Sequence, residues 1–202
     1  MRKIIAILLL CSSQVWAESI TEGNWDFMVL VDDREVGKHN FSVKAEQNGW
    51  LVNSTMALDF KILLIKKITY QHEATEQWQD GCLTQVSSRT KRQSKEVTTQ
   101  ASLTESGLMV VTADGDEILE GCVRSFAYWN PQLLQGERLL NVETGGYLPV
   151  KISSEVAPEN SHTHVTIAGS KINIQLEYDT TGDWIGLQTK LKTGAVLKYQ
   201  RI

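Results

Sequence analysis

Residues 50–60 read WLVNSTMALDF, and apolar and polar side chains alternate along this stretch. A period of two places the apolar side chains on one face, as in a β-strand with one side buried. Asn48-Gly49, just before it, has the composition of a tight hairpin turn, because both residues tolerate positive φ angles. The stretch therefore predicts the second arm of a β-hairpin. The side chains predicted on its apolar face are Trp50, Val52, Met56, Leu58 and Phe60.

The same alternation extends outward in both directions. Residues 37–45 form the first arm of the hairpin, and residues 66–78 follow an apolar run at 62–65. The run from 62 to 78 should be one long bent strand or two strands joined by a bulge. Short alternating runs separated by Gly and Asp turns continue to the C-terminus. We predict an all-β fold, a strongly curved antiparallel sheet or incomplete β-barrel of about 10–12 strands with one short helical turn, since that many twisted strands tend to curl or split.

One stretch interrupts this pattern. Residues 121–141 read GCVRSFAYWNPQLLQGERLLN. We expect a strand to end at Trp129, because Pro131 lacks the N–H that a ladder needs and restricts Asn130 before it. A single helical turn at residues 131–135 should follow, with Asn130 as its cap and proline at its first position. Asn130 and Pro131 are therefore assigned structural roles.

Three aromatic residues directly precede this turn. Phe126 and Tyr128 are two residues apart and share a strand face, whereas Trp129 takes the opposite face. We expect Phe126 and Tyr128 to point into the concave interior. Trp129 should pack under the turn and anchor it across the mouth of the sheet. Trp129 and Trp78, which lies at a strand end, are assigned structural roles.

The N-terminus has the pattern of a secretory signal peptide over residues 1–17. Basic residues precede an apolar run at 4–10, and small-residue spacing leads to a cleavage site after Ala17. Cleavage would leave a single β domain over residues 18–202, in keeping with its length. The apolar run is far shorter than the roughly 20 residues that a transmembrane helix needs, so no span is predicted. We expect a periplasmic or secreted protein.

The number of cysteines in the exported protein depends on this processing. Lipidation at Cys11 is an alternative to cleavage after Ala17, although Leu10 is bulkier than such a site prefers. Removal of the signal peptide leaves Cys82 and Cys122, an even number in an oxidising compartment. A single disulfide is the prediction, and two buried free thiols are the alternative.

Charge and motifs exclude several functions. Without the signal peptide, 18 basic and 24 acidic side chains remain, and the net charge changes from −4 to −6. An acidic, evenly mixed chain argues against nucleic-acid binding, which needs concentrated Lys and Arg. The motifs of serine hydrolases, phosphate loops, dinucleotide folds and zinc proteases are absent. We therefore assign no catalytic residue, no metal ligand and no cofactor.

The histidines differ in their surroundings. His162 and His164 lie beside a polar loop and are expected to face solvent and to be dispensable. His72 shares the apolar face of its run with Tyr70, so it is a polar group on a concave apolar surface or a hydrogen-bonded core histidine. Tyr70 and His72, with Phe126 and Tyr128, are the predicted ligand-binding residues.

Several short segments, in order along nearly the whole mature chain, form a recognisable set. They are Trp25-Asp26-Phe27, Val36-Gly37-Lys38-His39, Tyr70-Gln71-His72, Trp78-Gln79-Asp80-Gly81-Cys82-Leu83, Gly121-Cys122, Phe126-Ala127-Tyr128-Trp129-Asn130-Pro131, Leu139-Leu140-Asn141 and Thr144-Gly145. Together they resemble a family of uncharacterised secreted bacterial proteins. The resemblance brings no established activity. The architecture it implies is similar, more distantly, to the curved antiparallel sheets of periplasmic carriers that shelter acyl chains, and this step is an analogy of fold.

Three functions remain open from the sequence. The first is a non-enzymatic module that binds an apolar, lipid-like ligand or a partner segment on its curved sheet. The second is an enzyme with a site around Tyr70, His72 and Tyr128. The third is an envelope assembly protein that pairs a strand edge with another protein by β-augmentation.

Overall fold

The computed structural model describes residues 22–62 and 66–202. Apart from one 3₁₀ helix, the regular structure of this part of the chain is entirely β. No helix in it has the length and apolar character needed to cross a membrane. The strands are β1 (Gly23–Val31), β2 (Arg34–Glu46), β3 (Gly49–Ile62), β4 (Lys66–Gln79), β5 (Cys82–Arg92), β6 (Lys95–Thr104), β7 (Gly107–Thr112), β8 (Gly115–Leu119), β9 (Arg138–Asn141), β10 (Gly146–Pro149), β11 (Lys151–Val156), β12 (Thr163–Ala168), β13 (Asn173–Tyr178), β14 (Trp184–Lys190) and β15 (Val196–Arg201), and the helix is η1 (Pro131–Leu133).

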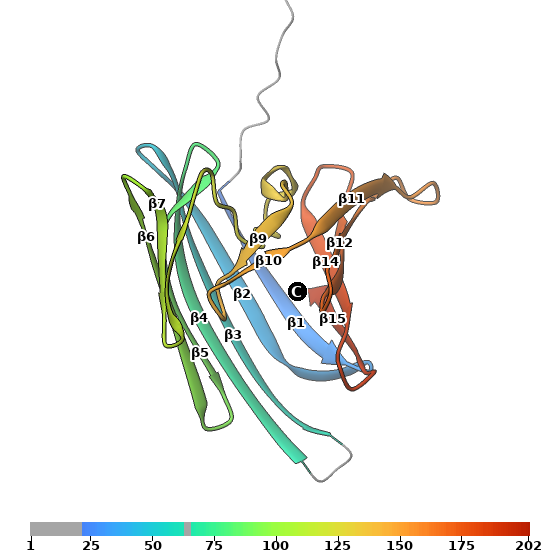
Figure 1. Ribbon diagram of the computed structural model, residues 1–202. Coiled ribbons are helices and arrows are strands. Elements are labelled where there is room, and N and C mark those ends of the chain that lie inside the picture. The colour runs from blue at the N-terminus through green and yellow to red at the C-terminus, as the bar shows by residue number, and fades with distance from the viewer. Residues whose placement is uncertain (1–21, 63–65) are drawn as a thin grey trace, which may run out of the picture.

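A single antiparallel sheet of 13 strands makes up most of this fold, in the order β11-β12-β13-β14-β15-β1-β2-β3-β4-β5-β6-β7-β8. The first and last strands along the chain, β1 and β15, pair with each other in the middle of this order. The sheet curves strongly, but β8 and β11 remain at its two edges and it does not close (Figure 1). The predicted fold class is confirmed. The strand number exceeds the predicted range, because the chain makes short additional hairpins such as β7–β8 and β9–β10.

The stretch at residues 50–60 lies in β3 and pairs with strands on both sides. Its register with β2 runs from Gly37↔Leu58 to Glu46↔Gly49, and with β4 from Gly49↔Gln79 to Ile62↔Lys66. The prediction for residues 62–78, one long bent strand or two strands joined by a bulge, is wrong at its start, because Ile62 ends β3 and pairs with Lys66 at the start of the antiparallel strand β4. Residues 63–65 of that prediction lie outside the described part of the chain.

Residues 120–150, the crossover segment, lead from β8 at one sheet edge to β11 at the other, across the concave face (Figure 1). The small β9–β10 sheet belongs to this segment. Backbone hydrogen bonds attach it to the sheet and to itself, from Leu83 N to the Val123 carbonyl at 2.9 Å and from Leu140 N to the Arg124 carbonyl at 2.8 Å. The crossover segment therefore fills part of the interior that a closed barrel would enclose.

The expected strand ending at Trp129 is not formed. Local turns occupy the backbone instead, with Tyr128 N donating to the Phe126 carbonyl at 2.8 Å and Asn130 N to the Ala127 carbonyl at 3.0 Å. The only ladder contact of this stretch in the described structure is an isolated bridge between Ser125 and Leu140. Aromatic side chains that favour strands thus lie in turns, because burial against the sheet outweighs local propensity.

The predicted helical turn is present. Pro131 is its first residue, and the Asn130 side chain accepts a hydrogen bond from Gln132 N at 2.9 Å. Leu133 and Leu134 from the turn are buried in the main core. The turn is shorter than expected, because the backbone leaves helical geometry at Leu134.

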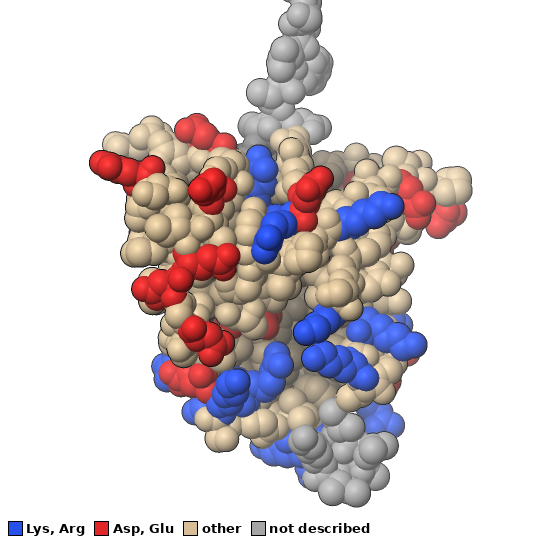
Figure 2. Space-filling model, in the orientation of Figure 1, with Lys and Arg blue, Asp and Glu red and all other residues tan. Residues whose placement is uncertain are grey.

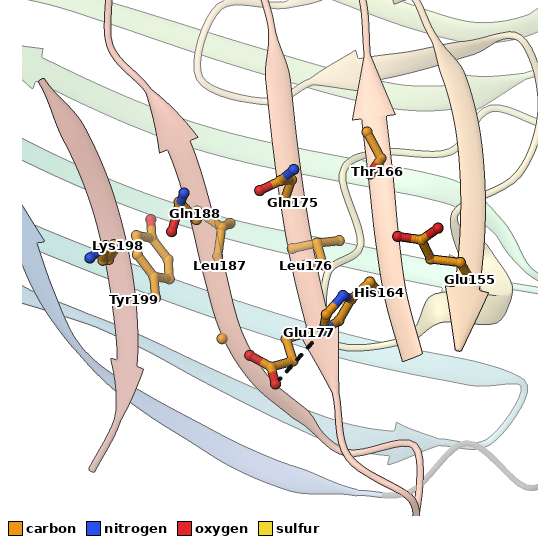
Figure 3. Close-up of a pocket in the computed structure, with 11 residues that line it drawn as sticks. Glu155, His164, Thr166, Gln175, Leu176, Glu177, Leu187, Gln188, Lys198 and Tyr199 are labelled. Atoms are coloured by element: carbon orange, nitrogen blue, oxygen red, sulfur yellow. Dashed lines mark ion pairs between the residues drawn. The ribbon is translucent and has the colours of Figure 1, made fainter. Parts of the chain in front are cut away.

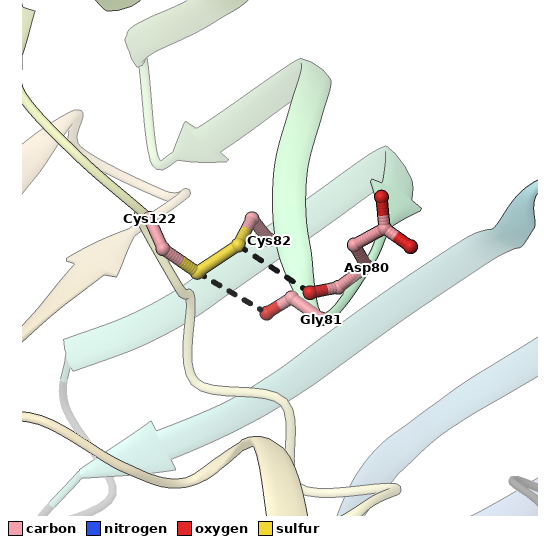
Figure 4. Close-up of a disulfide and its surroundings, with 4 residues drawn as sticks. All are labelled: Asp80, Gly81, Cys82 and Cys122. Atoms are coloured by element: carbon pink, nitrogen blue, oxygen red, sulfur yellow. Dashed lines mark hydrogen bonds between the residues drawn. A yellow bond between two sulfur atoms is a disulfide. The ribbon is translucent and has the colours of Figure 1, made fainter.

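The predicted disulfide joins Cys82, at the start of β5, to Cys122 in the crossover segment (Figure 4). Their Cα atoms are 5.1 Å apart, within the usual range for a disulfide. The sulfurs lie 3.6 Å and 3.7 Å from the carbonyl oxygens of Asp80 and Gly81 in the β4–β5 turn. The bond therefore fixes the beginning of the crossover segment to the sheet.

Buried apolar side chains form two clusters on the concave side. The main core lies between the sheet and the crossover segment, with Leu139 and Leu140 fully buried. A smaller cluster lies toward the end of the sheet at which β1 turns into β2, called here the β1–β2 end. Its buried members are Val29, Val36, Met56, Leu58 and Tyr70, with Val31, Phe60, Leu197 and Tyr199 packed against them and partly exposed.

Candidate functional site

The concave side is hollowed between the crossover segment and the β1–β2 end (Figure 2). Lys and Arg side chains gather around the lower part of this hollow, whereas Asp and Glu side chains lie mainly on the flank and the upper part of the same view. The smaller apolar cluster faces this region, and so do several polar side chains. We call this region the inner hollow.

Tyr70 and His72 reach the inner face from β4, where their period of two places them beside Met56 and Leu58 of β3. Both side chains are buried. The His72 Nδ1 lies 2.8 Å from the Thr90 hydroxyl on β5. Burial lowers the pKa of His72, so the ring is neutral at physiological pH. His72 is thus hydrogen-bonded within the wall of the hollow.

Glu143 enters the same region from the crossover segment, in the turn between β9 and β10. Its Oε2 lies 3.9 Å from Nη2 of Arg92, whose guanidinium is 5.3 Å from the centre of the Tyr70 ring. Burial raises the pKa of Tyr70, and the Glu143 carboxylate raises it further. The same carboxylate opposes the downward pKa shift of His72. After burial, Glu143 is therefore the next largest influence on the pKa of both Tyr70 and His72.

The back wall of the hollow carries a second histidine. His39 Nδ1 lies 2.9 Å from the Tyr199 hydroxyl, and its ring centre is 4.1 Å from that of Phe41. Burial lowers the pKa of His39 to about 3, and the neighbouring His72 lowers it too. Nε2 of His39 is buried and has no hydrogen-bond partner among the described residues. A buried polar atom of this kind is a candidate contact for a ligand or an ordered water.

Tyr128 comes from the crossover segment and packs among aromatic rings, 5.5 Å from Trp184 and 6.1 Å from Phe126. Its backbone carbonyl accepts a 2.8 Å hydrogen bond from the Tyr178 hydroxyl. Burial raises the pKa of Tyr128, and Glu143 contributes in the same direction. The Glu143 carboxylate thus acts to raise the pKa of all three of Tyr70, His72 and Tyr128. Phe126 joins them through Tyr128 and is itself half-buried.

Of the residues with predicted structural roles, Trp78 and Trp129 lie in the main core. Trp129 packs edge-on against Trp78, with ring centres 6.2 Å apart, and both rings are buried. Asn130 is also buried and caps the 3₁₀ helix that Pro131 begins. These positions are away from the smaller cluster and belong to the packing of the crossover segment.

A buried carboxyl also holds the crossover segment. The Ser125 hydroxyl donates a 2.6 Å hydrogen bond to the Glu76 carboxyl on β4. Burial raises the pKa of Glu76 to about 7, and the Ser125 hydrogen bond opposes that shift. Near neutral pH the Glu76 carboxyl is therefore protonated in a large fraction of the molecules.

A second concavity lies on the opposite, outer face of β11–β15, with a volume of about 330 Å³ (Figure 3). Glu155, His164 and Glu177 line it, and His162 contacts Glu177 at 2.7 Å through Nδ1. His162 therefore differs from the prediction of a free solvent-facing side chain, because only 25% of its side chain is exposed. In the described residues, no group of three or more His, Cys, Asp or Glu side chains is arranged to hold a metal ion.

Four members of the inner hollow were not among the predicted ligand-binding residues: His39, Arg92, Glu143 and Tyr199. The alternation of residues 37–45 already places His39 on the apolar face. No pattern in the sequence pointed to Glu143, because it lies in a turn whose position depends on the path of the crossover segment.

The described chain is thus an open, strongly curved antiparallel sheet whose concave face carries an internal crossover and a hollow. The family model described as Domain of unknown function (DUF6134) matches residues 27–202, and the chain belongs to that family. A comparison with curated proteins finds no match.

One solved structure is similar over nearly its whole length. It is described as a β-barrel-like protein of domain of unknown function DUF1849 from Brucella abortus. The TM-score is 0.62 at 11% sequence identity, and the match covers 91% of this chain and 96% of that chain. At this identity the likeness shows the fold alone.

Proposed function

We propose that this protein is a non-enzymatic binding module that holds an apolar, lipid-like molecule in the inner hollow. The observation that carries the proposal is the smaller apolar cluster on the concave face. Val31, Phe60 and Leu197 pack against it and stay partly exposed. Apolar surface with a few convergent polar groups in a concave site is typical of small-molecule binding.

The polar groups of the hollow suit binding better than catalysis. Burial keeps His39 and His72 neutral, and it raises the pKa of Tyr70. Glu143 is held beside the Arg92 guanidinium. An enzyme around Tyr70 and His72 would need a group poised to exchange a proton near neutral pH. The shifts of Tyr70 and His72 move both groups away from that range.

The disulfide supports a location in the periplasm or outside the cell, since such bonds persist in oxidising compartments. The signal-peptide pattern at residues 1–17 supports the same location. Intact mass of the exported protein tests this: a chain that starts at Glu18 is expected, and a chain acylated at Cys11 would contradict it.

Native mass spectrometry of gently purified protein tests the binding function. A lipid-sized adduct that organic solvent removes is expected. Binding of a long-chain fatty acid that carries a fluorophore provides the second readout. A protein that shows no adduct and binds no such probe contradicts the proposal.

A substitution that fills the hollow sharpens this test. Leu197 touches both apolar clusters, so Leu197→Trp should occupy ligand space and weaken probe binding about tenfold or more, as expected when well-fitting apolar contact is lost. Val156→Trp is the matched control, because Val156 is 65% exposed on edge strand β11. Equal loss of binding in both variants would argue against the hollow as the site.

A further inference from the structure

Basic side chains surround the open end of the inner hollow, although the protein as a whole is acidic. The chain is acidic overall, with Lys+Arg 20 and Asp+Glu 24. Figure 2 nevertheless shows Lys and Arg side chains around the lower part of the hollow. Successive side chains along a strand point to opposite faces of the sheet. The register of the sheet therefore decides which cations point inward and which point outward.

Arg92 is on the inner face. It lies two residues after Thr90, which contacts His72, and its guanidinium stacks over Tyr70. Lys95 is its direct partner across the β5–β6 ladder, so the two side chains share the inner face. Both are exposed.

Arg34 reaches the same end from β2. Its partner across the ladder is Val31, which packs against the smaller apolar cluster, so Arg34 shares the face of that cluster. Val31 pairs in turn with Leu197 on β15. Arg34 is exposed, and it makes no ion pair within the described residues.

The cations beside them point the other way. Lys91 adjoins Arg92 but pairs with Glu96, whose carboxylate binds Arg89 on the outer face. Lys61 follows the inward Phe60, and Lys190 follows Thr189, the partner of the inward Leu197. Three inward and three outward cations of similar exposure therefore lie near the same end of the sheet.

We infer that Arg34, Arg92 and Lys95 bind the acidic head group of a single-chain amphiphile whose hydrocarbon chain lies against the smaller apolar cluster. This inference rests on the proposed binding of an apolar molecule and specifies its chemistry. Guanidinium and ammonium groups form charge-assisted hydrogen bonds with carboxylate and phosphate. The Glu143 carboxylate beyond Arg92 disfavours deeper entry of an anion, so the head group stays at the open end.

The test compares head groups on one hydrocarbon chain. A fluorescent long-chain fatty acid, the alcohol with the same chain, and a lysophosphatidic acid used as competitor are titrated below their micelle concentrations. The wild type should bind the acid more tightly than the alcohol, and added salt should reduce that preference. Competition by the lysophosphatidic acid but weak binding of the fatty acid would identify phosphate as the preferred acid.

The triple variant Arg34→Gln, Arg92→Gln, Lys95→Gln should weaken binding of the acidic probes about tenfold or more, as expected for lost charge-assisted contacts, and change alcohol binding by less than about twofold. The matched control Lys61→Gln, Lys91→Gln, Lys190→Gln removes the same charge from the outer face. It should keep the preference for the acid.

The outcomes separate the two claims. Equal loss of acid binding in both triple variants would show a general effect of net charge and overturn the head-group site. Unchanged acid binding in the inward variant would overturn it as well, while the proposed binding function would stand. A wild type that binds neither the acid nor the alcohol would overturn the proposed function itself.

Discussion

The Ser125 hydroxyl donates a 2.6 Å hydrogen bond to the buried carboxyl of Glu76, and this contact joins the crossover segment to β4. The carboxyl is shielded from water on both sides, which raises its pKa to about 7. In the unfolded chain its pKa is the ordinary 4.5. Between pH 4.5 and about 7, the folded state therefore keeps a proton on Glu76 that the unfolded state releases.

The first prediction concerns this proton. Stability that depends on protonated Glu76 is fully present below pH 4.5 and is lost as pH rises through about 7, by roughly 3 kcal/mol for a shift of this size. Glu76→Gln should flatten the loss, because an amide oxygen still accepts from Ser125 and does not titrate. Urea denaturation at several pH values measures it. Glu73→Gln, an exposed position on the same strand, is the control and should leave the slope unchanged.

The second prediction concerns the stability of the fold at acidic pH. The pKa of His39 is lowered to about 3, so the neutral ring of the folded state stays neutral while the unfolded chain takes up a proton below pH 6.5. Stability should fall as pH decreases from 6.5 toward 3. His39→Gln keeps a polar partner for Tyr199 and should reduce this slope. An unchanged acid slope in the variant would assign the loss to other groups.

The third prediction concerns the disulfide. Cys82 and Cys122 are separated by 40 positions, and closing a loop of that length stabilises by roughly 4 kcal/mol in the chain-entropy model. Replacing both cysteines with serine should lower the free energy of unfolding by about that amount or less. Guanidinium denaturation measures the change, and reduction of the wild type should have a similar effect. Uptake of alkylating reagent by unfolded, unreduced protein would show that the bond is absent.

The fourth prediction separates packing from ligand contact. Trp129 is buried against Trp78, so Trp129→Ala should cost about 3–5 kcal/mol as a large-to-small change in a core. Tyr128→Phe should keep the fold and alter probe binding, because it removes only the hydroxyl. Thermal denaturation and probe titration of both variants provide the readouts. A stable Trp129→Ala variant that fails to bind would instead make that ring a ligand contact.

The fifth prediction concerns the outer face. His164→Ala should change stability by no more than about 0.5 kcal/mol, as at surface sites generally. His162→Ala also removes the contact with Glu177, and such partly exposed pairs contribute at most about 1 kcal/mol. Probe binding in the inner hollow should be unchanged in both variants, because the two faces of the sheet are separate. A larger loss of stability would mean that Glu177 holds the β12–β13 hairpin.

Local patterns predicted the curved antiparallel sheet and most of its strands, but not the hairpin that joins β3 to β4. The alternation around Val52 and Leu58 sets which face of β3 is buried, since a shift of one residue would turn every side chain to the other face. Asn130 and Pro131 predicted the capped turn, because a cap and a proline act within a few residues of themselves. The predicted signal cleavage would leave Cys82 and Cys122, and these two predicted the disulfide, since they allow only one pairing.

Tertiary packing decided what happens inside the sheet. Phe126, Tyr128 and Trp129 look like a strand in sequence, yet they form turns because the concave face buries them there more effectively than a ladder would. Glu143 becomes the charge beside Tyr70 and Arg92 only because the crossover segment returns across the sheet. Periodicity reports the face on which a residue lies within its own strand. It carries no information on which distant segment will lie opposite, and that contact determined both the hollow and its chemistry.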